Sequence, residues 1–438
     1  MSFPRYESYK DSGVEWLGQV PAHWKVKRLR FVAQLNPSKS EAAELDRETE
    51  VSFLPMEAVG DDGSLNLDRT RSIGDVETGY TYFREGDVTI AKITPCFENG
   101  KGAVMRGLLE GIGFGTTELI VARPLPSETT SDYLHWLFIS TPFRKRGEAS
   151  MYGAGGQKRV PDDFVRNFEI AFPVIQEQQT IAAFLDRETA KIDALIAEQQ
   201  RLIALLKEKR KAVISHAVTK GLNPGAPMKD SGIAWLGEVP EHWTIGAIKH
   251  FVTVLDGRRI PLSAEERSYK SGDYPYYGAS GIIDSIEEYI FDEDLVLVSE
   301  DGANLVNRST PIAFVARGLY WVNNHAHILK PTDKHLGYWA QRIEAIDLIP
   351  FITGSAQPKL TIQALANLVI AVPSSEDERE EIERFVVLQE NKADRLMQEA
   401  KAAINLLKER RSALISAAVT GKIDVRGFAD SLPHSHPA

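Results

Sequence analysis

The sequence predicts a mixed α/β fold of the α+β kind, in which two pseudo-symmetric globular domains are separated by two long helices that form an antiparallel coiled coil. Three observations predict this fold. The sequence contains an internal repeat of two copies, each copy begins with short β-rich runs, and each copy ends with a long helical stretch. A length of 438 residues alone would suggest about three domains. The repeat indicates instead two copies of one globular-plus-helix unit.

The repeat consists of four pairs of segments that keep their order along the chain. The pairs are 10–24 with 229–243, 116–124 with 323–331, 167–173 with 367–373, and 205–219 with 406–420. In the first pair 11 of 15 positions are identical. The offset between the copies falls from 219 to 207 and then to 200. Duplication followed by the shortening of loops in the second copy explains this pattern.

The globular part of each copy reads as mostly β structure. In the first copy we expect strands over 51–54, 88–91 and 118–121, because β-rich runs stand there between Gly, Pro and Asp residues. A short buried helix is expected over 133–139. The second copy repeats this plan, with expected strands over 295–298 and 312–315 and an expected helix over 335–346.

Each copy ends in a stretch whose apolar residues recur every 3.5 residues, which is typical of a coiled-coil seam. The stretch 176–218 contains no proline or glycine, and at 1.5 Å per residue it would span roughly 65 Å. We expect the two helices to pair with each other; the alternative is that each lies on its own domain. The predicted pairing residues are Ile181, Leu185, Ile192, Leu195, Leu202, Leu206 and Val213 in the first helix, and Ile382, Val386, Leu396, Leu407 and Leu414 in the second.

These patterns divide the chain into five segments. We expect globular domains over 1–174 and, with a linker, over 221–374. The helices should cover 175–220 and 375–421, and a tail should cover 422–438. Four tryptophans of the first repeated segment, Trp16, Trp24, Trp235 and Trp243, are expected to brace the structure near the helix ends.

Composition narrows the class of protein. The chain has 51 Lys and Arg residues and 61 Asp and Glu residues, so its net charge is −10. This argues against nucleic-acid binding, because proteins that bind nucleic acid usually carry a surplus of positive charge. The single cysteine excludes a disulfide framework and a cysteine-based zinc cluster, and it fits a reducing cytosol. We find neither a signal peptide nor an apolar run of the roughly 18 residues that cross a membrane. A cytoplasmic protein without membrane contact is therefore expected.

The motifs together resemble one known family. Each copy contains Trp-Leu-Gly-x-Val-Pro-x-His-Trp, a variable domain, a loop of small residues that ends in Gln157 or Gln357, a proline, and a long helix with Leu-Leu-Lys-Glu-(Lys/Arg)-Arg. Two further stretches look like family hallmarks: 86–101, and 276–284 together with 321–327. This order is similar to the specificity (S) subunit of type I restriction-modification systems of bacteria and archaea.

The resemblance implies a non-catalytic subunit with two target-recognition domains. Each domain would read one half of a bipartite, asymmetric sequence in double-stranded DNA, and the helices would set the unread gap. The helices would also carry two methyltransferase (M) subunits, through which nuclease-translocase (R) subunits join. No cofactor is then expected in this chain, and S-adenosylmethionine, ATP and Mg are expected on the partner subunits. Two alternatives stay open: a recognition module of another methyltransferase-nuclease assembly, and a coiled-coil scaffold with no DNA role.

Catalytic motifs are missing from the sequence. There is no Gly-x-x-x-x-Gly-Lys-Ser/Thr phosphate loop and no Asn/Asp-Pro-Pro-Tyr/Phe run of an amino-methyltransferase. His325 and His327 alternate in a β-like run and would face the same way. We interpret them as hydrogen-bonded or DNA-contacting residues and expect no metal, because no third ligand is evident nearby.

DNA contact requires local positive charge and side chains that reach base edges. The window 142–159 carries a local surplus of four positive charges. In the first domain the candidate contacts are Lys92, Phe97, Asn99, Lys101, Arg144, Lys145, Arg146, Gln157, Lys158 and Arg159. In the second they are Arg258, Arg259, Tyr276, Tyr277, Asn304, Asn323, Asn324, His325, Gln357 and Lys359. Any of these cations could equally belong to an ordinary solvated face.

Overall fold

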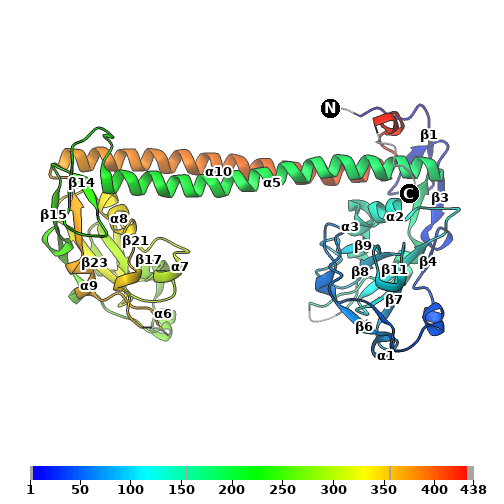
Figure 1. Cartoon of the computed structure of the whole chain (residues 1–438), viewed down its shortest axis with the longest axis horizontal. Helices are drawn as coiled ribbons and strands as arrows, with labels where there is room; N and C mark the ends of the chain where they lie inside the picture. The colour runs from blue at the N-terminus through cyan, green and yellow to red at the C-terminus, as the bar shows by residue number, and fades with distance from the viewer. Residues whose placement is uncertain (1–2, 154–155, 355–356, 432–438) are drawn as a thin grey trace. The chain divides into compact units, whose positions relative to one another are not determined.

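The computed structural model describes residues 3–153, 156–354 and 357–431. The chain divides into two compact units. Unit 1 contains Met1–Gln199 and Ala402–Ala438, and unit 2 contains Gln200–Lys401. The boundaries fall inside two long helices, α5 (Ile175–Lys220) and α10 (Glu376–Val419), so each unit holds part of both helices (Figure 1).

Unit 1 builds its globular part from short strands and helices. The strands are β1 (Tyr9–Asp11), β2 (Gln19–Pro21), β3 (Lys25–Arg28), β4 (Ala33–Leu35), β5 (Glu50–Leu54), β6 (Thr70–Ser72), β7 (Thr81–Arg84), β8 (Val88–Ala91), β9 (Gly102–Val104), β10 (Ile112–Gly115), β11 (Leu119–Pro124) and β12 (Glu169–Phe172). The α-helices are α1 (Ile73–Val76), α2 (Ser131–Ile139), α3 (Thr141–Ser150) and α4 (Asp162–Asn167), and the 3-10 helices are η1 (Leu29–Phe31), η2 (Lys39–Glu44), η3 (Met56–Ala58), η4 (Leu109–Gly111) and η8 (Arg426–Ser431).

Unit 2 repeats this inventory in shorter form. Its strands are β13 (Met228–Asp230), β14 (Glu238–Pro240), β15 (Thr244–Ala247), β16 (Val252–Val254), β17 (Ser271–Gly278), β18 (Gly281–Ile286), β19 (Phe291–Asp292), β20 (Leu295–Ser299), β21 (Ala313–Ala316), β22 (Leu319–Val322), β23 (Ala326–Pro331) and β24 (Val369–Val372). Its helices are α6 (Ala264–Tyr269), α7 (Asn304–Asn307), α8 (Leu336–Glu344), α9 (Ile362–Asn367), η5 (Ile248–His250), η6 (Asp256–Arg258) and η7 (Ile349–Phe351).

The two units share one sheet plan. A four-stranded sheet has the order β4-β11-β8-β9 in unit 1 and β16-β23-β20-β21 in unit 2. A second has the order β6-β5-β10-β7 in unit 1 and β18-β17-β22-β19 in unit 2, with one parallel pair in each, β5 with β10 and β17 with β22. The central strands β8 and β20 are buried at every position, which fits their mostly apolar sequences, Val-Thr-Ile-Ala and Leu-Val-Leu-Val-Ser. The predicted fold, with two repeated mixed domains and two long helices, is confirmed.

The repeated segment 10–24 forms a clamp on the first turn of a long helix. In unit 1 the buried Glu177 accepts hydrogen bonds from Trp24 Nε1 at 3.0 Å and from the Tyr6 hydroxyl at 2.8 Å, and His23 Nε2 lies 2.8 Å away. In unit 2 Glu378 lies at the same distances from Trp243 Nε1 and His242 Nε2. A carboxylate in the first turn also interacts favourably with the helix dipole. Trp24 and Trp243 are therefore structural braces, as the sequence predicted.

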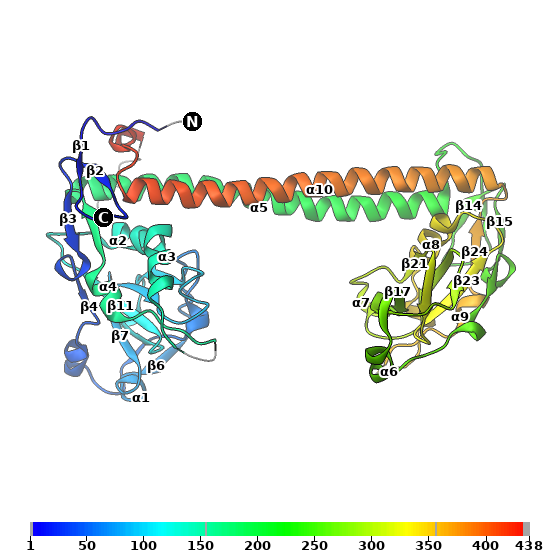
Figure 2. The same ribbon diagram turned by 180° about the vertical axis from the view of Figure 1, so that it is seen from behind.

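The long helices pair antiparallel within each unit (Figures 1 and 2). In unit 1 Arg411 of α10 contacts Asp193 of α5 at 3.0 Å. In unit 2 Arg210 of α5 contacts Asp394 at 2.7 Å and Glu390 at 3.2 Å. Of the predicted pairing residues, those that lie buried are Ile181, Leu185, Ile192, Ile382, Val386 and Leu414, and those that lie half-buried are Leu206, Val213 and Leu407.

The predicted seam is wrong at Leu195, Leu202 and Leu396, which are exposed by 46%, 43% and 39%. In the middle of α10 the buried positions are Ala393, Met397, Ala400 and Ile404, so the neighbour of the predicted Leu396 is buried in its place. The reason is geometric: an undistorted helix has 3.6 residues per turn, so its buried face drifts away from a strict 3.5-residue ladder.

No helix among the described residues combines the length and the apolar character that a bilayer crossing requires.

Candidate nucleic-acid interface

In unit 1 the end of β8 meets the segment that contains Gln157. Its described residues, 152–153 and 156–159, are here named glutamine loop 1. Tyr152 and Arg159 bond to each other through both backbone groups. Thr94 N donates to Lys158 O at 2.9 Å, and Val160 N donates to Lys92 O at 2.8 Å. The fold thus brings Lys92 together with the loop, although about 65 residues separate them in the sequence. Gln157 and Lys158 are exposed.

An ion pair fixes the base of glutamine loop 1. Arg159 donates from Nε and Nη2 to both oxygens of Glu118, at 2.9 Å and 2.7 Å. The hydrogen bond from Arg159 is the main reason why the pKa of Glu118 lies below its ordinary value, and Lys92 adds a favourable charge. A bidentate pair fixes the direction of the guanidinium as well as its distance. Arg159 therefore orients the end of the loop.

The other candidates of the first domain fall into two groups. Lys145 and Asn99 are exposed. Phe97 is buried in the core against Phe143, and its ring fills the space above Gly147, so its predicted contact with DNA is wrong. The sequence could not reveal this, because a buried and an exposed phenylalanine look alike in a loop sequence.

Three predicted cations of unit 1 have structural partners. Arg144 donates to the backbone oxygen of Glu98, and burial lowers the pKa of its guanidinium. Arg146 lies over the Trp16 ring at 4.3 Å from its centroid. Lys101 Nζ donates to the Met56 oxygen at 3.1 Å. These contacts hold the long side chains against the domain, so we do not place these three among the DNA-reading groups.

Unit 2 repeats the arrangement in a segment whose described residues, 353–354 and 357–359, are here named glutamine loop 2. Thr353 and Lys359 bond through both backbone groups, Gly302 N donates to Pro358 O at 3.0 Å, and Leu360 N donates to Glu300 O at 2.7 Å. Gln357 and Lys359 are exposed. The same backbone frame therefore presents a glutamine and a neighbouring cation at the end of the central strand in both units.

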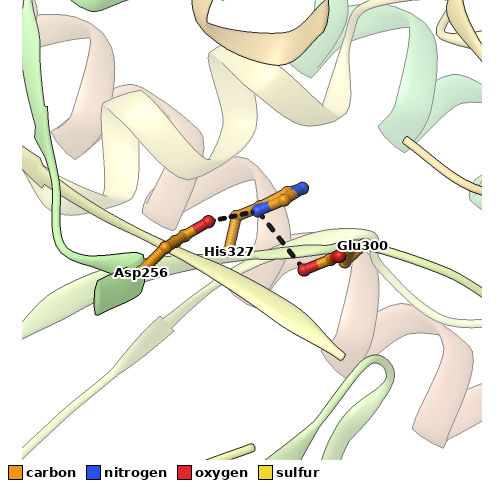
Figure 3. Close-up of side chains that lie close together, drawn as sticks. All are labelled: Asp256, Glu300 and His327. Atoms are coloured by element: carbon orange, nitrogen blue, oxygen red, sulfur yellow. Dashed lines mark hydrogen bonds and ion pairs between the residues drawn. The ribbon is translucent and has the colours of Figure 1, made fainter. Parts of the chain in front are cut away.

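Beneath glutamine loop 2 lies a buried cluster of charges (Figure 3). His327 of β23 is 1% exposed, and its Nδ1 lies 2.7 Å from Asp256 and 3.6 Å from Glu300. Arg259 contacts Glu300 at 2.5 Å and Asp256 at 3.3 Å, and Lys359 contacts Glu300 at 3.1 Å. Burial by itself would raise the pKa of Asp256 and of Glu300. The hydrogen bonds from His327 and Arg259 respectively hold both pKa values below their ordinary range.

Asp256, Glu300 and His327 are the kinds of side chain that hold a divalent metal, and their ligand atoms lie within 4.8 Å of one another. Their hydrogen bonds do not suit a metal, however. His327 Nε2 faces the Leu360 oxygen at 2.8 Å, and the Arg259 guanidinium sits on the carboxylate oxygens. A cation already balances these acids, so we interpret the cluster as an ion-pair network.

Several candidates of the second domain are packed or bonded within the unit. Tyr276 is fully buried, so its predicted DNA contact is wrong. Tyr277 is half-buried and packs against Phe314 and Tyr320. The remaining side chains have intramolecular partners: Arg258 pairs with Glu293, Asn304 accepts from Thr310 N, the buried Asn323 accepts from His325 N, and His325 contacts Asp301. Asn324 is exposed.

Comparison with known proteins gives the family. The model of the type I restriction modification DNA specificity domain matches twice, over residues 21–205 and 240–414. The chain belongs to this family. Each match starts near a clamp and ends in a long helix, so the matched specificity domains coincide with the two copies in the sequence.

Curated relatives agree with this assignment. Over 189 residues the chain is 43% identical to the Type I restriction enzyme EcoAI specificity subunit and 41% identical to the EcoEI specificity subunit, both of Escherichia coli. Each alignment covers 43% of this chain and 31% of the relative, so the chain matches about a third of their length. A chain from a structure of a type I R-M system has a TM-score of 0.68 at 17% identity and covers 91% of this chain and 98% of its own. The HsdS subunit from Thermoanaerobacter tengcongensis has a TM-score of 0.56 at 17% identity, over 92% of this chain and 98% of its own. These two likenesses concern the fold.

Sequence reasoning missed the acidic residues of both specificity domains. Glu118 and Glu300 anchor the glutamine loops, and Glu177 and Glu378 complete the clamps. Cations contact phosphates directly, whereas an acid that holds such a cation gives no direct signal in the sequence. A signal was present for the clamp residues, because a glutamate follows the proline of Pro173 and of Pro373 within five positions in both copies.

Proposed function

We propose that this chain is the non-catalytic DNA-recognition subunit of a type I restriction-modification complex. Each unit reads one half of a bipartite, asymmetric site in double-stranded DNA. The paired helices set the gap between the halves and bind two methyltransferase subunits, through which nuclease-translocase subunits join. S-adenosylmethionine, ATP and Mg are bound by these partners rather than by this chain.

The observation that carries the proposal is the recurrence of one exposed arrangement in two units that differ elsewhere. In each unit, backbone hydrogen bonds fix a glutamine loop at the end of the central strand, and an ion pair anchors its last residue, Arg159 or Lys359. Glutamine amides and cationic side chains are groups that read adenine and guanine edges or hold phosphates. The family assignment gives these groups a DNA target.

The acidic balance of the chain fits a subunit that binds DNA together with partners. A net charge of −10 opposes tight binding by the chain alone. The long helices offer a surface for such partners, because they carry leucines that are exposed despite their apolar character. These are Leu195, Leu202, Leu205, Leu388, Leu396 and Leu406. Exposed apolar side chains that recur along helices are typical of an interface with another protein.

Methylome sequencing of cells that express the chain with its methyltransferase gives the target motif. Footprinting of the purified complex on a duplex with that motif should then protect two half-sites, with affinity that falls steeply as salt rises. The chain alone should bind the same duplex far more weakly. Nanomolar binding by the chain alone at physiological salt would refute the dependence on partners. A complex that protects random duplexes equally well would refute sequence recognition and favour the scaffold alternative.

A further inference from the structure

The paired helices of unit 2 leave an apolar hollow where the last turns of α5 meet α10. It has a volume of about 320 Å³, and apolar side chains form most of its walls: Val213, Ala217, Leu222 and Phe385. Among its described lining residues, only His216 has a polar side chain. An apolar cavity of roughly 150 Å³ already holds a benzene ring. The hollow therefore has the size and the chemical character to receive an aromatic side chain.

The corresponding place in unit 1 is filled by the chain itself. The glutamates of the two clamps make the same contacts at the start of α5 and of α10 and are 201 positions apart, so Phe184 is the counterpart of Phe385. The centroid of the Phe184 ring lies 5.5 Å from that of Phe3 and 5.4 Å from that of Phe428. Phe184 is therefore buried, whereas Phe385 is only half-buried.

The chain does not supply such a cover in unit 2. Phe3 and Phe428 belong to two separate segments that meet in unit 1, where Asp424 N donates to the Pro4 oxygen at 2.8 Å. In unit 2 a single linker, 221–227, joins α5 to β13 at this place. Its sequence, Gly-Leu-Asn-Pro-Gly-Ala-Pro, contains no aromatic residue. We therefore expect a ring that fills the hollow to come from another chain.

The helix surface beside the hollow is apolar in unit 2 and charged in unit 1. Leu388 is exposed and lies three residues after Phe385, on the same face of α10. Its counterpart in α5 is Arg187. Other exposed leucines occur at matching positions of both units: Leu195 with Leu396, and Leu205 with Leu406. These shared pairs fit a partner that binds both units, and Leu388 extends this apolar surface toward the hollow in unit 2 only.

We propose that the hollow of unit 2 receives an aromatic side chain of the methyltransferase subunit, so that the methyltransferase at unit 2 is held more tightly than the one at unit 1, where Phe428 fills the same place. The identity of the partner rests on the proposed function. The preference of the hollow for an aromatic ring does not, because it follows from the packing of Phe3 and Phe428 on Phe184. Burial of one additional phenyl ring corresponds to at least about tenfold in affinity.

A first measurement tests the hollow on the full chain without any partner. The probe is N-acetylphenylalaninamide, with N-acetylalaninamide as its matched control, in a methyl-labelled NMR spectrum assigned by single substitutions. We expect the phenylalanine compound to shift the methyl signals of Val213 and Leu222, because a ring in the hollow lies against both side chains. Their counterparts in unit 1, Leu414 and Ile423, should not shift, since Phe428 already packs in their core. Absent shifts at Val213 and Leu222, or equal shifts in both units, would overturn the inference.

A second measurement titrates the full chain with purified methyltransferase. Native mass spectrometry counts the bound subunits, and hydrogen exchange locates them. At one methyltransferase per chain, the helix turns around Val213 and Leu388 should be protected before those around Leu414 and Arg187. The dissociation constants of the two steps should differ by at least about tenfold beyond the statistical factor for two sites. Two equal steps, or first protection in unit 1, would overturn the inference.

Matched substitutions assign the difference to the hollow. Ala212 lines the hollow and is exposed, and Ala413 is its exposed counterpart in unit 1. Ala212→Trp places a ring of the chain itself in the hollow and should weaken the tighter step about tenfold, whereas Ala413→Trp should change neither step by more than about twofold. Leu388→Arg, which gives unit 2 the residue type of unit 1, should act in the same direction as Ala212→Trp. Equal effects of the two tryptophans would overturn the inference. If the methyltransferase binds neither unit while the phenylalanine compound still shifts the methyl signals, the proposed function fails and the aromatic preference of the hollow stands.

Discussion

At the scale of single residues, acids rather than cations organise the candidate surfaces. Glu177 and Glu378 bind the indole and imidazole groups of the repeated segment. Glu118 and Glu300 form ion pairs with the cations of the glutamine loops, Arg159 and Lys359. The clamps differ in one respect. Glu177 is 6% exposed and has a third donor in Tyr6, whereas the side chain of Glu378 is 24% exposed. Water can replace a lost donor more readily in unit 2.

The clamps allow a matched comparison of two substitutions. Trp24→Phe and Trp243→Phe each remove one indole N–H from a glutamate and leave a ring in the core. We expect Trp24→Phe to destabilise unit 1 by about 1–3 kcal/mol and Trp243→Phe to destabilise unit 2 by less, because the cost rises with the burial of the unpaired acceptor. Hydrogen exchange followed by mass spectrometry reads each unit separately. A larger loss of protection in unit 2 would contradict the clamp argument.

His135 of α2 gives unit 1 a sensitivity to acid. Its Nδ1 is buried without a hydrogen-bond partner among the described residues, and burial lowers its pKa to about 4 from the ordinary 6.5. The folded pKa lies below the unfolded one, so this group stabilises unit 1 fully above pH 6.5 and progressively less as the pH falls toward 4. We expect unit 1 to lose thermal stability between pH 7 and pH 5, and His135→Asn to reduce that loss. An identical pH dependence in the variant would contradict this.

Residue types alone predicted the candidate surface only in part. The loop glutamines and their neighbouring cations lie exposed where the repeat suggested. The predictions for Phe97 and Tyr276 were wrong, because an aromatic residue suits a base stack and a hydrophobic core equally well, and only the tertiary fold decides between them. The acidic anchors were missed because their role depends on partners from distant segments, which no local spacing shows.

At the scale of elements, the sequence predicts where the long helices begin and end better than it predicts which face of each helix is buried. Uninterrupted helix-forming residues indicate where α5 and α10 run. The side that each helix buries depends on the difference between 3.5 and 3.6 residues per turn, which rotates the buried face by about 20° for every seven residues. In the middle of α10 the predicted seam residue Leu396 is exposed, whereas the smaller Ala393 and Ala400 are buried.

Two adjacent residues of α10, Leu396 and Met397, allow the effect of a substitution on stability to be measured separately from its effect on assembly. Met397 is buried at 9% exposure and Leu396 is 39% exposed. We expect Met397→Ala to destabilise unit 2 by about 2 kcal/mol, within the range for a buried large-to-small change. Leu396→Ala should hardly alter stability but should weaken binding of the methyltransferase. Denaturant unfolding and a titration with purified methyltransferase measure the two effects. The reverse pattern would show that the buried seam follows the 3.5-residue ladder after all.

At the scale of the whole molecule, the repeat was the most informative signal in the sequence. It predicted two units with one sheet plan, which the matching strand orders confirm. It could not predict that the position of the buried His327 in β23 is taken in unit 1 by the buried Ile120 of β11. The two copies keep the same strand pairing but differ in the side chains beneath their glutamine loops.

The helices allow a test of the proposed gap-setting role. Inserting seven residues at matching positions of α5 and α10 adds about two turns and roughly 10 Å, so the seam keeps its phase. We expect the preferred gap between half-sites to lengthen by about three base pairs, at roughly 3.4 Å per pair. Methylome sequencing of cells with the altered chain measures this directly. An unchanged gap would refute the role of the helices as a spacer.

The division of the chain into two units also determines the order in which the units can be completed during protein synthesis. Unit 2 is one continuous stretch, Gln200–Lys401, whereas unit 1 joins Met1–Gln199 to Ala402–Ala438. Within unit 1, Leu414, Ile415 and Ala418 belong to the same core as Trp24 and Leu185. During synthesis the ribosome therefore releases every residue of unit 2 before the last part of the unit 1 core exists. The domain that is encoded first is the last to be completed, and a nascent chain carries its unfinished core for about half of the translation time.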